Sequence, residues 1–135
     1  MEKSSALRIL IVDDEPLIRW SLAETLSHLG HEIAETGDAR QTLDVLAGGY
    51  RPDVVLLDFR LPDSDDLNLL RSIRAASPTS AVVMMSAYVT PEVADGARQL
   101  GAYGVVSKPV ELTDLPALVI DSHAAHVRAQ NGHQH

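Results

Sequence analysis

One stretch of the sequence decides the fold: Val54-Val55-Leu56-Leu57-Asp58-Phe59-Arg60-Leu61-Pro62-Asp63. Four apolar residues lead directly into the carboxylate of Asp58. Turn-forming residues flank the run, with Arg51-Pro52-Asp53 before it and Leu61-Pro62-Asp63-Ser64 behind it. This pattern is typical of a strand that is buried on both faces in the middle of a parallel sheet. Because open α/β folds place their chemistry at the C-terminal edge of such strands, we take Asp58 to be the reactive group.

The composition limits the class of protein. The chain has 135 residues, which favours one domain with a core large enough to fold alone. It contains no cysteine, so disulfides and thiol chemistry are excluded. No apolar run is long enough for a membrane span, and Met1 to Leu7 has no signal-peptide core, so we expect a cytoplasmic protein without a membrane contact. The net charge of −8 argues against nucleic acid bound by this segment itself.

Strand and helix patterns alternate along the chain. Short apolar runs predict strands at residues 8–12, 31–35, 54–57, 81–85 and 104–107. The more polar second run suggests a strand at the edge of the sheet. Helical spacing, caps and glycine stops predict helices at about residues 16–29, 39–47, 67–77, 91–100 and 113–122. Crossover handedness and short loops favour a doubly wound parallel sheet with helices on both faces.

We expect one domain over residues 6–122, preceded by a disordered N-terminus at residues 1–5. From about His123 the composition turns to Ala, His, Gln, Asn and Gly, which predicts a frayed helix end and a flexible tail over residues 123–135. Four histidines in this part have no second kind of ligand beside them: His123, His126, His133 and His135. We therefore expect solvent-exposed side chains there rather than a metal site.

Polar residues follow four of the predicted strands at once: Asp13 with Asp14, then Asp58, Ser86 and Lys108. In a parallel sheet these strand ends emerge on the same edge, so the side chains gather there. Grouped carboxylates need a hard divalent cation, and oxygen ligands with retained waters suit Mg²⁺. A carboxylate beside that cation can attack phosphorus and form an acyl phosphate. Lys108 and Ser86 would then meet the other phosphoryl oxygens.

The sequence resembles a receiver domain of bacterial two-component response regulators. The resemblance covers roughly residues 6–122 and is carried by four motifs, Leu10-Ile11-Val12-Asp13-Asp14-Glu15, Leu56-Leu57-Asp58-Phe59-Arg60-Leu61-Pro62-Asp63, Met85-Ser86-Ala87 and Val106-Ser107-Lys108-Pro109. Any one of them alone is a weak signal, but their order and spacing together are highly specific. The resemblance implies a flavodoxin-like fold in three α/β/α layers with strand order 2-1-3-4-5.

The resemblance also assigns roles at the site. It implies that a sensor histidine kinase or phosphotransfer protein phosphorylates Asp58. It implies that Ser86 and Lys108 contact the phosphoryl group and that the peptide bond between Lys108 and Pro109 is cis. Magnesium would be held by Asp13, Asp14, Asp58 and the main-chain carbonyl of Arg60.

The output implied by the resemblance is a change in partner binding. Phosphorylation is expected to pull Ser86 inward and to remodel the face made by the fourth helix, fifth strand and fifth helix. This face would bind a downstream effector protein or a fused output domain, and it leaves room for a phosphorylation-dependent dimer.

Three positions depart from the family pattern. Val105 stands where the family usually has a switch aromatic, with Tyr103 two residues earlier. Asp66 stands where glycine is usual and raises the local negative charge. Arg60 occupies a variable position two residues after the phosphoacceptor, and we hypothesise that its side chain influences the lifetime of the phosphate.

Two other functions fit the sequence less well than a phosphorylatable switch. A magnesium phosphotransferase or phosphatase usually carries a second acid where this chain has Arg60, so we expect no enzyme activity beyond self-phosphorylation from a phosphodonor and autodephosphorylation. An unphosphorylated pseudo-receiver is disfavoured because all the site residues are present. The chain as an excised receiver of a larger transcriptional regulator or hybrid kinase remains an alternative.

Overall fold

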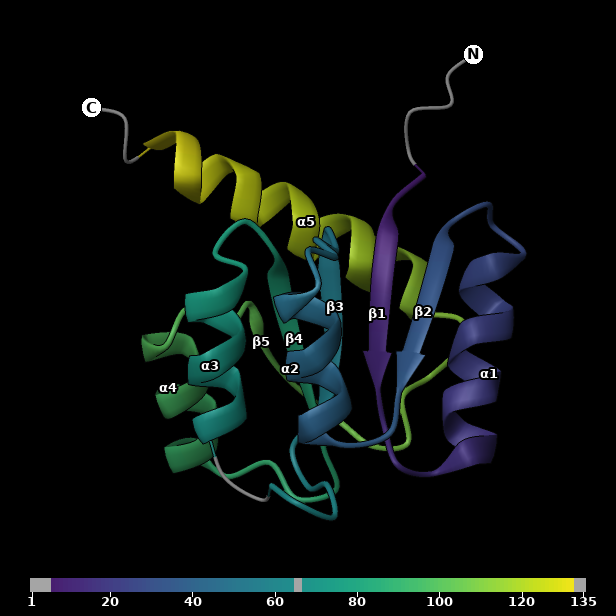
Figure 1. The fold of residues 1–135 in the computed structure, drawn as a ribbon, viewed down its shortest axis with the longest axis horizontal. Coiled ribbons are helices and arrows are strands. Elements are labelled where there is room, and N and C mark those ends of the chain that lie inside the picture. The colour runs from purple at the N-terminus through teal and green to yellow at the C-terminus, as the bar shows by residue number, and fades with distance from the viewer. Residues whose placement is uncertain (1–5, 65–66, 133–135) are drawn as a thin grey trace.

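The computed structural model describes residues 6–64 and 67–132. Its sheet has five parallel strands in the order β2-β1-β3-β4-β5 (Figure 1), which confirms the predicted flavodoxin-like fold. The strands are β1 (Arg8–Val12), β2 (Glu32–Thr36), β3 (Val54–Asp58), β4 (Ala81–Ser86) and β5 (Gly104–Ser107). The helices are α1 (Pro16–Ser27), α2 (Ala39–Ala47), α3 (Asn68–Ala76), α4 (Pro91–Gln99) and α5 (Leu115–Gly132).

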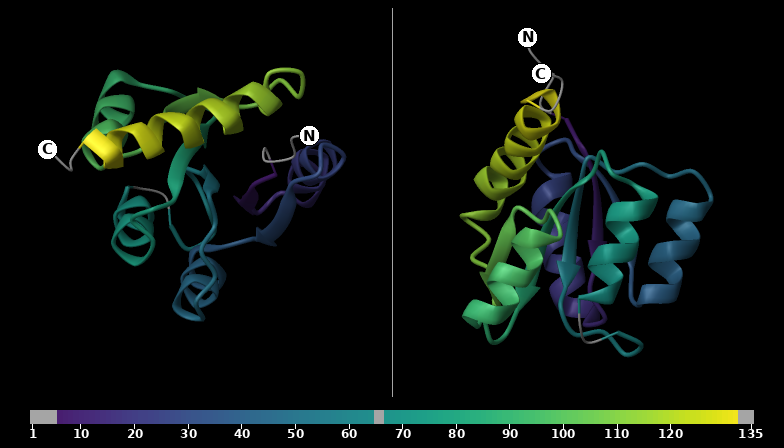
Figure 2. Two further views of the ribbon diagram at one scale, coloured as in Figure 1. Left: turned by 90° about the horizontal axis from the view of Figure 1, so that it is seen from above. Right: turned by 90° about the vertical axis from the view of Figure 1, so that its left-hand side faces the viewer.

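The sheet is covered on both faces, so its alternating side chains feed two apolar clusters. Ile9 and Ile11 of β1 pack with Leu26 of α1 and Val119 of α5. Leu10 and Val12 point to the other face, where the cluster contains residues of α2, α3 and α4. Figure 2 shows α1 and α5 on one side of the sheet and the other three helices opposite. Every residue of β3 and β4 is buried, as expected for strands inside a parallel sheet.

The strand register positions the polar side chains. Val12 lies beside Leu57 in the β1–β3 pair, so Asp13 and Asp58 follow neighbouring residues. Asp58 is paired with Met85, and Ser86 with Ser107, so Ser86 and Lys108 continue the same edge. Packing in the centre of the sheet therefore brings residues from four strands to one rim.

The helix signals in the sequence are found at the expected places. Thr90 caps α4 by accepting a hydrogen bond from the Val93 amide at 3.2 Å, and Pro91 begins the helix. Asp38 caps α2 through the Gln41 amide at 2.8 Å. The Gln41 side chain, however, accepts from the Gly37 amide, one residue before the cap, so the capping box is only half formed.

Helix α5 extends farther than the sequence suggested. It continues through the residues after His123 to Gly132. The expectation that His123 and His126 are solvent-exposed is wrong, because both are half-buried. The carbonyl of Pro78 accepts hydrogen bonds from His126 Nε2 at 2.9 Å and from Gln130 Nε2 at 3.0 Å. Alanine and glutamine favour helix, and these contacts attach the last turns to the turn before β4.

Some predictions fall outside the described residues: those for residues 1–5, Asp66, His133 and His135. Among the described helices, none is long and apolar enough to cross a membrane.

His31 lies buried directly before β2, with 8% of its surface exposed. Its Nδ1 atom accepts a hydrogen bond from the main-chain amide of Leu7 at 2.9 Å. Accepting this bond requires Nδ1 to carry no proton, and burial lowers the pKa of His31. The folded state therefore holds the neutral imidazole.

We expect His31 to make stability depend on pH. Because its pKa is lower in the folded chain than in the unfolded chain, its contribution is complete above about pH 6.5 and is lost as the pH falls below that value. Urea unfolding at about pH 7.5 and about pH 5.5 should show the loss in the wild type, on the order of 1 kcal/mol. His31→Asn, whose amide oxygen can replace Nδ1 as the acceptor, should reduce the loss.

The matched control is His28→Asn, since His28 is exposed and forms an ion pair with Glu24 at 3.3 Å. An equal acid-dependent loss in the wild type and in His31→Asn would contradict the assignment.

Candidate functional site

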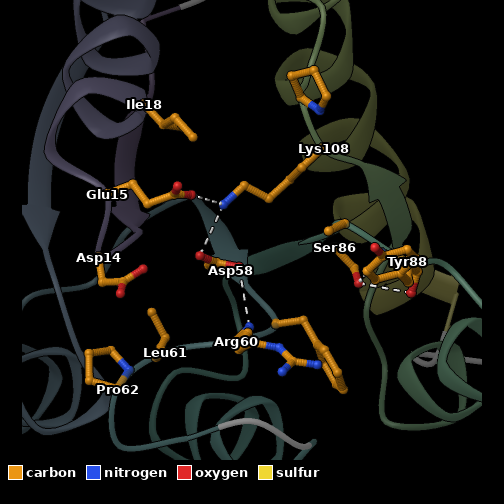
Figure 3. Close-up of a pocket in the computed structure, with 13 residues that line it drawn as sticks. Asp14, Glu15, Ile18, Asp58, Arg60, Leu61, Pro62, Ser86, Tyr88 and Lys108 are labelled. Atoms are coloured by element: carbon orange, nitrogen blue, oxygen red, sulfur yellow. Dashed lines mark hydrogen bonds and ion pairs between the residues drawn. The ribbon is translucent and has the colours of Figure 1, made fainter.

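The C-terminal edge of the sheet opens into a cavity of about 670 Å³. Its lining includes Asp58 and Ser86, which end β3 and β4, and Lys108, which follows β5 (Figure 3). Asp14 and Glu15, from the turn between β1 and α1, complete the acidic side. The residues predicted from the strand ends are thus brought together.

Lys108 is the centre of the charge arrangement. Its Nζ atom donates hydrogen bonds to Asp13 Oδ2 at 3.1 Å, Asp58 Oδ2 at 3.1 Å and Glu15 Oε1 at 2.9 Å. The side chain of Asp13 has no exposed surface and that of Asp58 has 6%, whereas that of Glu15 is 56% exposed. Two buried carboxylates therefore share one ammonium group, and the exposed Glu15 is its third acceptor.

Burial and pairing act in opposite directions on these groups. Burial raises the pKa of Asp58, with a further rise from the charge of Asp13, although the hydrogen bonds from Lys108 and the Arg60 amide oppose it. Burial alone would lower the pKa of Lys108, but its hydrogen bonds with Glu15, Asp58 and Asp13 outweigh that effect and raise it. Lys108 is therefore a permanent cation beside a carboxylate that is costly to keep ionised.

Four carboxylate side chains of this edge could hold a metal ion: Asp13, Asp14, Glu15 and Asp58. One ligand oxygen from each lies within 4.8 Å of the others. A set made only of oxygen donors suits a hard divalent cation such as Mg²⁺ rather than a soft transition metal. The donor chemistry thus fits the predicted cation, while the role of the Arg60 carbonyl remains a prediction.

The main chain after β3 is also fixed at the site. The Phe59 amide donates to the Met85 carbonyl at 2.8 Å, which continues the β3–β4 ladder by one residue. The Arg60 amide donates to Asp58 Oδ1 at 3.2 Å. Both oxygens of Asp58 therefore have partners, Arg60 on one and Lys108 on the other.

Ser86 lies at the rim of the cavity, and its hydroxyl is engaged with the main chain of Tyr88. It donates to the Tyr88 carbonyl at 3.0 Å and accepts from the Tyr88 amide at 3.2 Å. The structure therefore places Ser86 at the cavity without a hydrogen bond to Asp58 among the described contacts.

The peptide bond between Lys108 and Pro109 is cis, as the resemblance implied. Val105 is partly buried against the cluster of α2, α3 and α4, while Tyr103 is 45% exposed. Tyr103 therefore lies on the surface next to β5 rather than in the core.

Sequence reasoning missed two contributors to the site. Glu15 stands at the end of the Leu10–Glu15 motif without an assigned role, but it contacts Lys108 directly. Arg19 was not considered, although its guanidinium donates to the main-chain carbonyl of Asp13 at 2.7 Å and to Glu35 at 3.1 Å. The adjacency of Glu15 to Asp14 was a usable signal, whereas nothing in the spacing of Arg19 pointed to Asp13.

Comparison with known proteins shows the family of the chain. The family model of the response regulator receiver domain matches residues 9–120.

Three curated relatives illustrate the similarity. The chain is 37% identical over 112 residues to the regulatory protein AtoC of Escherichia coli (strain K12), covering 83% of this chain and 24% of AtoC. It is 35% identical over 115 residues to the DNA-binding transcriptional regulator NtrC of Azospirillum brasilense, covering 85% of this chain and 24% of NtrC. It is 35% identical over 113 residues to the transcriptional regulatory protein PdtaR of Mycobacterium tuberculosis (strain ATCC 25618 / H37Rv), covering 82% of this chain and 54% of PdtaR.

Solved structures give the same result. A CheY-like response regulator receiver domain protein from Methanospirillum hungatei JF-1 superposes with a TM-score of 0.84 at 26% identity, covering 93% of this chain and 99% of that one. A crystal structure of NtrX from Brucella abortus superposes with a TM-score of 0.83 at 33% identity, covering 96% of this chain and 29% of that one.

Removing the shared cation should destabilise the fold. Lys108→Met keeps an apolar stem but leaves Asp13 and Asp58 as neighbouring buried carboxylates. We expect the free energy of unfolding to fall by about 3 kcal/mol, as measured by urea denaturation in the presence of a chelator.

Adding Asp58→Asn to Lys108→Met should recover part of the loss, because one of the two unpaired charges is removed. The control Arg98→Met removes an exposed cation of α4 and should change stability by less than about 0.5 kcal/mol. A double variant no more stable than Lys108→Met would show that Lys108 does not offset the charge of Asp58.

Proposed function

Because the chain belongs to the response regulator receiver domain family, we propose that it is a phosphoacceptor switch in a phosphorelay. Asp58 takes a phosphoryl group from a sensor histidine kinase or phosphotransfer protein. The observation that carries this proposal is the pairing of Asp58 with Lys108 at 3.1 Å in an open cavity, beside the buried carboxylate of Asp13.

The transfer step is a nucleophilic displacement on phosphorus. A carboxylate oxygen of Asp58 forms a bond to phosphorus while the phosphorus–nitrogen bond of the donor phosphohistidine breaks. The electron pair of that bond returns to the imidazole nitrogen, and the product is an acyl phosphate on Asp58. Lys108 offsets negative charge on the phosphoryl oxygens, because its ammonium already lies within hydrogen-bond distance of Asp58.

The cofactor in this proposal is Mg²⁺, held by Asp13, Asp14, Asp58 and the main-chain carbonyl of Arg60. Support comes from the closely spaced carboxylate oxygens, which are hard ligands. When bound, the cation would neutralise charge on the transferring group. The side chain of Arg60, beside the cavity, influences how long the phosphate survives.

The switch begins at Ser86. Its hydroxyl leaves the main chain of Tyr88 to bond a phosphoryl oxygen, which gives up two hydrogen bonds at that turn. Because the turn leads into α4, its rearrangement alters the face made by α4, β5 and α5. This face binds an effector protein or a fused output domain, and Tyr103 beside β5 and Ile120 of α5 are exposed apolar side chains in these elements.

The output concerns transcription in this proposal, since AtoC, NtrC and PdtaR are regulatory proteins. The chain spans about a quarter of the length of AtoC and NtrC and about half of PdtaR.

Activity is limited to self-phosphorylation and autodephosphorylation, because Arg60 replaces the second acid that phosphatases use. A cytoplasmic location is part of the same proposal.

Phosphorylation can be tested on the chain directly. Incubation with Mg²⁺ and a small-molecule phosphodonor should add one labile phosphoryl group, measured as intact mass. Asp58→Asn should give no adduct, and a chelator should suppress it in the wild type.

The matched control is Asp44→Asn, which removes an exposed carboxylate of α2 and should leave the adduct unchanged. An adduct that persists in Asp58→Asn, or turnover of excess phosphate esters, would contradict the proposal. No adduct in the wild type would favour a pseudo-receiver.

A further inference from the structure

The main chain that leaves β3 turns sharply beside the cavity. Arg60, Leu61 and Pro62 line the cavity wall. The Leu61 amide donates to the Ser64 carbonyl at 2.7 Å, and the Ser64 amide donates back to Leu61 at 3.2 Å, which closes a tight turn. Leu61 is 5% exposed and belongs to the cluster beneath α2 and α3, so one side of the turn is held by packing.

Asp63 lies in this turn, but its carboxylate is directed at another element. Oδ1 accepts from the Ala39 amide at 2.8 Å, and Oδ2 accepts from the Arg40 amide at 3.2 Å. Ala39 is the first residue of α2, so Asp63 satisfies two amides that the helix itself leaves unpaired. These bonds, led by that of Ala39, lower the pKa of the exposed Asp63.

Helix α2 already has a local cap. Asp38 bonds the Gln41 amide at 2.8 Å, which is sufficient to begin a helix. The contacts of Asp63 come from 23 and 24 residues away in sequence. Their additional effect is therefore to attach the turn after β3 to α2.

The attachment constrains the main chain at the reactive residue. Arg60, three positions before Asp63, donates its amide to Asp58 Oδ1 at 3.2 Å. The Arg60 main chain is thus held between Asp58 on one side and the anchored turn on the other.

We propose that Asp63 is a positioning residue that ties the Arg60–Ser64 turn to the N-terminus of α2 and thereby presets the main chain of Arg60 for cation binding beside Asp58. The inference rests on the proposed function, since it concerns the same site. Asp63 itself is not among the residues that line the cavity.

The experiment compares Asp63→Ala with Asp38→Ala, which removes a cap of the same helix but leaves the turn after β3 intact. Each variant is titrated with Mg²⁺ and followed by backbone amide chemical shifts, and amide hydrogen exchange is measured without Mg²⁺. Asp63→Ala should bind Mg²⁺ roughly tenfold more weakly, the low end of the effect of supporting residues on metal affinity. Asp38→Ala should bind as the wild type does, although both variants should unfold at lower urea concentration.

Asp63→Asn keeps one acceptor for the Ala39 amide and should recover part of the affinity, so a poorly folded Asp63→Ala does not end the test. Equal Mg²⁺ affinities in Asp63→Ala and Asp38→Ala would overturn the inference.

The amide exchange separates this inference from the proposed function. A wild-type chain without Mg²⁺ binding or phosphorylation would end the proposed function and the cation part of the inference. The anchoring would then be judged on the Arg60 amide alone: faster exchange in Asp63→Ala than in Asp38→Ala supports it, and equal exchange refutes it.

Discussion

The site depends on one electrostatic constraint, which is that two carboxylates buried side by side require a cation. Asp13 has no exposed surface and Asp58 has almost none, so neither can be stabilised by water alone. Lys108 supplies this cation. It follows β5, which is separated from β3 by β4, and its Nζ atom lies 3.1 Å from an oxygen of each carboxylate. The parallel sheet brings the three side chains together, because it places the C-terminal ends of β1, β3 and β5 at one edge. The same carboxylates leave a surplus of negative charge around a single ammonium group, which is an arrangement that attracts a hard divalent cation.

The parts that could be predicted from the sequence are those that depend on strand order alone. Asp13, Asp58 and Lys108 each follow a short apolar run, and any parallel sheet brings such residues together whatever their rotamers. The contact between Glu15 and Lys108 depends on the direction of one side chain in a turn, which no spacing pattern specifies. The reach of Asp63 to α2 likewise depends on how a loop folds back over the sheet. Residue patterns therefore locate the polar residues at the strand ends. The contacts that Glu15 and Asp63 make depend on tertiary structure, which these patterns do not specify.

The extent of α5 could not be predicted for a similar reason. From about His123 the composition turns to Ala, His, Gln, Asn and Gly, so the sequence indicated fraying. In the structure this part is stabilised by polar contacts to a single main-chain oxygen, the carbonyl of Pro78. That carbonyl also accepts from Arg74 Nη1 of α3 at 2.9 Å. A turn carbonyl with three side-chain donors has no local signature, because the donors come from two helices, α3 and α5, that are far apart in the sequence.

The hydrogen bonds to the Pro78 carbonyl have a mechanical consequence for α5. Its first turns are embedded in the core through Leu115 and Val119, and its last turns are fastened at Pro78. A rod supported at both ends cannot swing freely about one of them. A displacement applied midway along α5 is therefore converted into bending of the helix or into rotation about its long axis. Either motion strains both the core contacts of the first turns and the hydrogen bonds to Pro78.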